Sequence, residues 1–258
     1  MIHRKSPEEI TIMKEGGEKL KAILAHLLSE VKAGKTGVDI EKRACNFIAK
    51  AGGRPSFQMV PNYHWATCIC INDAVVHGIP NNIPFDEGDV VGVDIGMFYK
   101  GFHTDTSWTI QIKDQRSKIK DTNQSEKINK FLITGEVALE QAILACKIGN
   151  SIGHISNVIQ HTVEREGYSV VRELVGHGVG KKLHEDPEVP CFLGKKIEKT
   201  LPVAEGMVLA IEVIYTMGKP EIYIDERDGW TIRTKDGTLS ALFEKTVALE
   251  SKGAVVLT

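Results

Sequence analysis

Five residues spread along the sequence carry side chains that can bind divalent metal ions as a group. They are four acids and one histidine, and each lies in a short strand-like segment: Asp94, Asp105, His177, Glu212 and Glu244. An acidic side chain inside an apolar run costs free energy unless a partner compensates for its desolvation. Two divalent ions would balance the four negative charges, so the set predicts a two-metal site.

The acids are more informative together than singly. Asp94, Glu212 and Glu244 are each a lone acid within an apolar run, and for Glu244 the adjacent Lys245 is an alternative partner. His177 lies between two glycines, where a single histidine is commonly structural. Three isolated acids in strand-like runs favour a metal over three separate ion pairs.

A hairpin is expected to bring the first two acids together. Residues 90–95 and 104–112 are strand-like and flank a turn-like stretch, so Asp94 and Asp105 would face each other on neighbouring strands. Gly96 shares a strand face with Asp94 and would leave room for an ion. Asp105 alone would instead be a polar residue beside a turn.

Oxygen-rich ligation with one imidazole suits Mn²⁺, Fe²⁺, Co²⁺ or Zn²⁺. Two such ions, ~3.5–4 Å apart, activate a water and stabilise the oxyanion that forms at a carbonyl, which predicts hydrolysis of an amide or ester. His77 and His184 could donate hydrogen bonds to the substrate, although a structural role for either alone stays open. The sequence lacks the phosphate-loop and HExxH motifs of other catalytic systems.

Composition indicates an ordinary globular protein. Hydrophobic residues make up 42% and charged residues 26% of the 258 positions, and the net charge is −2. We therefore expect no specific nucleic-acid partner, no membrane span and a cytoplasmic location. The five cysteines have irregular spacing, which favours reduced and mostly buried thiols.

Local signals predict helices and strands that would position these residues. The first helix has a capping box at Ser6 and Glu9 and is expected to end near Val31, and the second begins near Thr36 with Asp39 three residues later. The other expected elements are a strand at 67–71, the two strands of the hairpin, a polar loop at 113–126 and helices at 125–146 and 151–166.

An internal repeat suggests two similar halves. Residues 32–40 align with 147–155 at an offset of 115 positions. The alternative is that helix starts and stops simply look alike. If the repeat is real, halves 1–115 and 125–258 form a single catalytic domain, 1–258, with the site between them.

The motifs resemble those of the methionine aminopeptidase family, type I, over nearly the whole chain. The matching segments are VDIG around Asp94, HTDT around Asp105, GHGVG around His177, IE at Glu212, FEKTV around Glu244, VHGIP around His77 and LHEDP around His184. The resemblance implies an α+β pita-bread fold. This fold has a curved, mostly antiparallel sheet with outer helices and pseudo-twofold halves.

The resemblance also implies metal-binding roles. Asp94 would chelate one ion, Asp105 and Glu244 would bridge two ions, and His177 and Glu212 would complete the shell of the other. Glu212 would also handle the proton of the attacking water.

Substrate contacts follow from the same resemblance. His77 would contact the substrate amide, and His184 the carbonyl and the tetrahedral intermediate. The methionine pocket would be walled by Tyr63, Cys68, Leu183 and Trp230. Leu183 stands where many members have an aromatic residue, and the stretch 60–66 departs from the usual pattern.

The implied activity is removal of the N-terminal methionine from new polypeptides whose second residue is small. The protein would act as a monomer, with transient association with the ribosome. Two alternatives remain: a dimetal prolidase or proline aminopeptidase, and a metal-free binding relative of the same fold.

Overall fold

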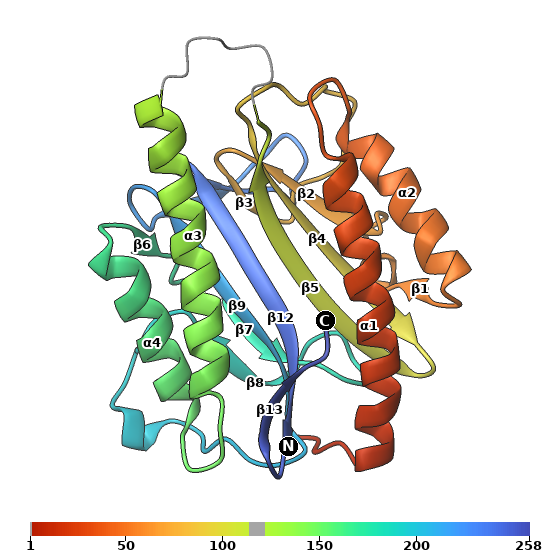
Figure 1. Cartoon of the computed structure of the whole chain (residues 1–258), viewed down its shortest axis with the longest axis vertical. Helices are drawn as coiled ribbons and strands as arrows, with labels where there is room; N and C mark the ends of the chain where they lie inside the picture. Colours follow the sequence, from red (N-terminus) through yellow and green to blue (C-terminus); the bar gives the residue numbers. More distant parts are fainter. Residues whose placement is uncertain (1, 114–121) are drawn as a thin grey trace.

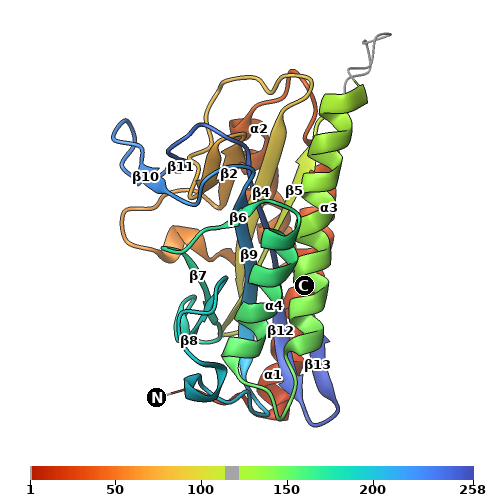
Figure 2. The same ribbon diagram turned by 90° about the vertical axis from the view of Figure 1, so that its left-hand side faces the viewer.

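A single antiparallel sheet of ten strands, with four long helices on one face, makes up most of the molecule (Figures 1 and 2). The structure is a computed structural model that describes residues 2–113 and 122–258. The main path through the sheet runs β1-β4-β5-β12-β9-β7-β8, with β2 paired to β4, β6 to β9 and β13 to β12. A second sheet contains β10, β11 and β3.

The helices are α1 (Pro7–Glu30), α2 (Gly37–Lys50), α3 (Thr122–Ala145) and α4 (Ile152–Arg165), with short 3₁₀ turns at Phe57–Met59 and Ile197–Lys199. The strands are β1 (Arg54–Pro55), β2 (Thr67–Ile71), β3 (Ala74–Val76), β4 (Val90–Tyr99), β5 (Phe102–Gln111), β6 (Ser169–Val170), β7 (Val175–Gly178), β8 (Glu185–Pro190), β9 (Val208–Thr216), β10 (Ile222–Ile224), β11 (Ile232–Thr234), β12 (Ser240–Glu250) and β13 (Gly253–Val256).

Both predicted capping boxes are present. The Ser6 side chain accepts a hydrogen bond from the Glu9 backbone N–H, and the Ser6 N–H donates to the Glu9 side chain; Thr36 and Asp39 form the same pair of bonds. The predicted loop at 113–126 is wrong at its far end, because α3 already begins at Thr122. Polarity does not distinguish a loop from the exposed first turn of a helix. Residues 114–121 of that prediction lie outside the described residues.

The two helix pairs repeat at the spacing found in the sequence. α1 and α3 both have 24 residues and α2 and α4 both have 14, and each later helix begins 115 positions after the earlier one. Thr36 and Ser151 are the corresponding N-caps. Gly34 and Gly149, two residues before these caps, both have positive φ values, 82° and 94°.

The core lies between the helices and the sheet. In β4, Val91, Val93 and Ile95 are fully buried beneath α1 and α2, so the alternate residues, including Asp94, face away from the helices. A second apolar cluster lies beneath α3 and α4 and includes Phe243 of β12. The face of the sheet opposite the helices is therefore where polar side chains gather. None of the helices in the described part of the chain is long and apolar enough to cross a membrane.

Candidate metal centre

Five adjacent strands each supply one of the predicted metal ligands. In sheet order, β4 carries Asp94, β5 carries Asp105, β12 carries Glu244, β9 carries Glu212 and β7 carries His177. Residues far apart in the sequence are thereby placed side by side in one row across the sheet. Strand pairing, rather than a local motif, positions the set.

The hairpin of β4 and β5 is present, but its register corrects one expectation. Asp94 is opposite Ser107, and Asp105 is opposite Gly96, so the two acids are diagonal neighbours rather than a facing pair. Gly96 does not leave space for an ion either. A Cβ at this glycine would lie 2.8 Å from the Cβ of Ser56, so the absence of a side chain lets the Ser56 segment pack against the sheet.

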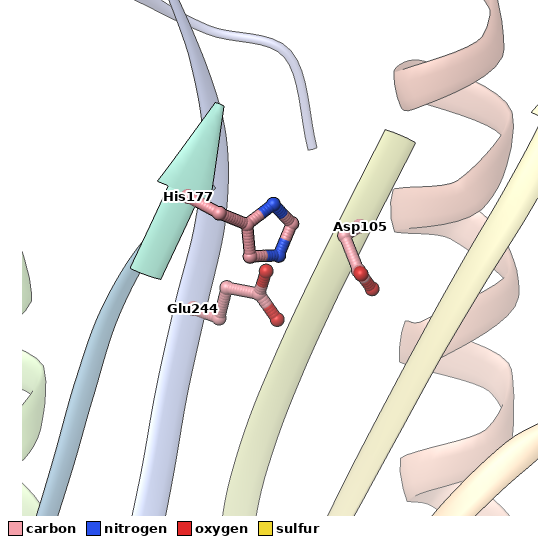
Figure 3. A group of neighbouring side chains, drawn as sticks. All are labelled: Asp105, His177 and Glu244. Carbon is pink, nitrogen blue, oxygen red and sulfur yellow. The ribbon is translucent and has the colours of Figure 1, made fainter. Parts of the chain in front are cut away.

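Three of the ligands converge closely. One ligand atom from each of Asp105, His177 and Glu244 lies within 4.8 Å of the others, and Figure 3 shows the His177 ring above the Glu244 carboxylate with Asp105 beside them on the next strand. The Nδ1 atom of His177 lies 2.8 Å from the carbonyl oxygen of Gly178. Since a carbonyl only accepts, Nδ1 carries the proton, and Nε2 faces Glu212 Oε1 at 3.6 Å with its lone pair available.

The electrostatics of the site disfavour negative charge. Burial raises the pKa of Asp105 to about 7. Burial, reinforced by neighbouring carboxylates, raises the pKa of Asp94, Glu212 and Glu244 well above the usual range. Burial also lowers the pKa of His177 to about 4, so this imidazole is neutral and can act as a ligand.

The residues present fit divalent cations. Asp94 Oδ1 and Glu244 Oε1 are buried and have no hydrogen-bond partner. Lys245, the alternative partner, places its ammonium 5.3 Å from the centre of the Trp108 ring. Among the described residues, no lysine or arginine forms a salt bridge with any of the four acids. Hard oxygen atoms without a protein counter-charge are what such ions require.

All eleven residues expected at the site line one cavity of about 150 Å³. Tyr63, Cys68 and Leu183 are buried in one apolar cluster against which Trp230 packs. The Tyr63 hydroxyl donates to the carbonyl of Thr67 at 3.0 Å, which fixes the ring at the cavity wall. The rings of Tyr63 and Trp230 meet edge to face at 5.1 Å between centroids.

His77 and His184 line the same cavity from the solvent side. His77 follows β3 and has a left-handed backbone with φ of 57°. The His184 ring packs edge to face against His177, with 4.5 Å between centroids. Desolvation by surrounding protein lowers the pKa of both outer imidazoles, so both are neutral near pH 7 and can donate one hydrogen bond.

Four further lining residues were not anticipated from the sequence: Phe57, Val60, Val76 and Leu242. They are isolated apolar residues in the sequence. The only sequence signal for them was that Val60 lies three residues before Tyr63 and that Val76 directly precedes His77. A wider cleft of about 820 Å³ adjoins the cavity and shares His77, His177, His184 and Glu212 with it. The cavity therefore opens into a wider cleft.

A family model described as metallopeptidase family M24 matches residues 11–251 of the chain. The chain belongs to metallopeptidase family M24. Use of a divalent metal follows from this membership and agrees with the acidic cluster described above.

Relatives of this M24 chain match it over its full length. Methionine aminopeptidase from Clostridium perfringens is 38% identical over 258 residues, which cover 100% of the chain and 99% of the relative. Methionine aminopeptidase 1 from Bacillus subtilis is 36% identical with the same coverage. The crystal structure of methionine aminopeptidase from Thermotoga maritima has a TM-score of 0.90 and 36% identity, and the match covers 100% and 99% of the two chains.

The M24 fold is also shared with longer enzymes. The prolidase from Pyrococcus horikoshii has a TM-score of 0.76 at 21% identity, and the match covers 99% of this chain but 63% of the prolidase. This likeness shows the common fold alone. Together with the Thermotoga structure, it confirms the α+β pita-bread architecture expected from the sequence.

Proposed function

We propose that this M24 chain removes the N-terminal methionine from polypeptides whose second residue is small. The proposal rests on one observation: a row of acids and a group of apolar side chains line the same cavity of about 150 Å³. An unbranched apolar side chain fits this wall, and the acids lie where the adjacent peptide bond would be. The full-length relatives named methionine aminopeptidase support the same activity.

The metal complement that we propose is two divalent ions, each Co, Mn, Fe or Zn. Asp94 would hold one ion, Asp105 and Glu244 would bind both, and His177 with Glu212 would complete the coordination of the second ion. When bound, such ions polarise a carbonyl and make water a nucleophile near neutral pH. The orphaned oxygens of Asp94 and Glu244 support this assignment.

The remaining chemistry falls to side chains of the chain itself. Trp230, Tyr63, Cys68 and Leu183 would enclose the methionine side chain and exclude water from it. The Glu212 carboxylate would accept the proton of the attacking water.

The two outer imidazoles would hold the scissile peptide from the cleft side. His77 would hydrogen-bond the substrate amide, and His184 would donate to the carbonyl oxygen as its charge grows.

We also propose that residues 1–258 act as one catalytic domain and as a monomer. It would work in the cytoplasm and associate transiently with the ribosome.

Peptide hydrolysis tests the activity directly. The purified chain, supplied with Mn²⁺ or Co²⁺, should release methionine from Met-Gly-Met-Met and from the corresponding alanine peptide. Preferential cleavage of peptides with proline at position two would instead support a prolidase. Absence of release from every peptide, together with absence of metal binding by calorimetry, would support the metal-free alternative.

His184→Ala separates the substrate contacts from the metal ligands. We expect turnover to fall about 100-fold, the usual contribution of a positioned proton donor, while metal content stays unchanged. Stoichiometric loss of metal from this variant would contradict the assignment of His184 to the substrate.

A further inference from the structure

A buried ion pair joins the segment before α1 to the turn that carries His184. Lys5 Nζ lies 2.8 Å from Glu185 Oε2, and the two side chains are only 1% and 12% exposed. Lys5 is also fixed through its backbone, because its N–H donates to the carbonyl of Gly206 at 2.7 Å. A lysine is rarely buried this completely, so the position of this charge requires an explanation.

Two glycines make room for the Lys5 segment. A Cβ at Gly180 would lie 2.5 Å from Cε of Lys5 and 2.8 Å from Oε1 of Glu185. Gly206 has a φ of 82°, and a Cβ there would lie 2.9 Å from the Lys5 carbonyl oxygen. The third glycine of the GHGVG motif is thus explained by the passage of the Lys5 side chain rather than by ligation.

Glu185 connects this ion pair to the backbone of the turn between β7 and β8. Its second carboxylate oxygen accepts a hydrogen bond from the Lys182 N–H at 3.0 Å, and the Gly180 N–H donates to the Lys182 carbonyl at 3.0 Å. Burial alone would raise the pKa of Glu185, but the hydrogen bonds from Lys5 and Lys182 outweigh it and lower the pKa. The carboxylate therefore stays charged and keeps the turn closed.

The closed turn presents two site residues on adjacent positions. Leu183 points into the apolar wall of the cavity, and His184 lines its mouth beside His177. Opening of this turn would break the bonds that Glu185 makes to Lys5 and Lys182. Within the described residues, Lys5 forms no hydrogen bond with a lining residue of the 150 Å³ cavity, so it acts on the site through Glu185.

We propose that Lys5 is a positioning residue for catalysis, which with Glu185 holds the turn 180–185 so that His184 faces the substrate carbonyl. This inference rests on the proposed function. Removing the ammonium leaves an uncompensated buried carboxylate, and the turn must then open to hydrate it. His184 would lose its fixed orientation while the metal ligands, which lie on other strands or before the turn, would stay in place.

Kinetics of Lys5→Met provide the first test, with Lys100→Met as the control. Lys100 forms an ion pair with Glu15 at the same 2.8 Å, but its side chain is 56% exposed. For Lys5→Met we expect kcat with Met-Gly-Met-Met to fall about tenfold and KM to change less than about twofold, since an orienting contact acts mainly in the transition state. Lys100→Met should retain wild-type kinetics.

A double-mutant cycle distinguishes positioning from general loss of stability. In the His184→Ala background, Lys5→Met should lower kcat by less than about twofold, because its effect passes through His184. Equal losses in both backgrounds would overturn the proposal. If Lys5→Met is not folded by circular dichroism, Glu185→Gln replaces it, with the same losses expected and wild-type kcat as the overturning result.

A measurement on the metal-free protein keeps the inference separate from the proposed activity. Hydrogen exchange of the backbone amides at 181–185 should be at least about tenfold faster in Lys5→Met than in wild type, and unchanged in Lys100→Met. Unchanged exchange in Lys5→Met overturns the inference. A wild-type enzyme that releases no methionine overturns the proposed function, and the exchange result still decides whether Lys5 holds the turn.

Discussion

Glu212 and Glu244 lie directly opposite each other on the adjacent antiparallel strands β9 and β12. Like charges at facing positions of a sheet destabilise it, and here burial raises the pKa of both carboxyls well above the usual range. The facing pair therefore lowers the stability of the fold, and both carboxyls line the cavity. Removing one of the two charges should therefore have opposite effects on stability and on activity.

Glu244→Gln tests this trade-off. In the metal-free protein at pH 8, we expect the melting temperature to rise by about 2–4 °C, which corresponds to roughly 1 kcal/mol in a domain of this size. Activity with Met-Gly-Met-Met should fall at least about 100-fold, because the amide cannot replace an anionic ligand. Calorimetric melting of the chelator-treated proteins measures the first effect, and a lower melting temperature in the variant would contradict the prediction.

Because of Asp105, the stability of the metal-free protein should fall as the pH rises toward 7. Its folded-state pKa is raised to about 7, so between the usual aspartate pKa and about pH 7 the folded state binds more protons at this site than the unfolded state. This contribution to stability is present at low pH and is lost as pH rises toward 7. Compared with Asp105→Asn, the wild type should lose stability over this window in urea unfolding, and a parallel pH profile would sink the prediction.

Trp230→Ala should weaken methionine binding without removing metal. The indole packs edge to face on Tyr63 and closes the apolar wall. Losing this contact should raise KM about tenfold, equivalent to ~1.4 kcal/mol of binding free energy. Metal content from elemental analysis should match wild type. An unchanged KM would mean that the methionine side chain binds elsewhere.

The thiols should react slowly in the folded protein. All five cysteines are free, and four are buried. Burial and the nearby Glu41 raise the pKa of half-buried Cys45 to about 11, which lowers its thiolate fraction at pH 7.5 roughly 100-fold. A disulfide reagent such as DTNB should therefore react rapidly only after addition of denaturant. Fast reaction of one native thiol would show that Cys45 is more open than the structure indicates.

Local chemistry made much of this fold predictable. The capping boxes at Ser6 and Thr36 involve residues three positions apart, so the helix starts could be identified to within a residue. Strand β2 was predicted with its observed bounds, because residues 67–71 form a short strand-like run that ends at the polar Asn72. The five expected ligands were recognisable because each is a polar residue whose burial needs a partner.

What escaped prediction depends on long-range pairing. The hairpin at Asp94 and Asp105 was expected, but its register is set across the whole sheet, so their diagonal relation was not apparent. The Lys5–Glu185 pair spans 180 positions and has no local pattern. Phe57 and Leu242 are ordinary apolar residues, and only the folded arrangement brings them to the cavity.

The placement of one ligand on each of five adjacent strands also determines when the metal centre can form. The Asp105 N–H donates to the Thr246 hydroxyl, a partner 141 positions away, so joining β5 to β12 requires the closure of a long loop of chain. Before that pairing the chain has no complete chelating set, which means that metal cannot nucleate folding as zinc does in a zinc finger. On the proposed assignment, chelation instead requires that all five strands have paired.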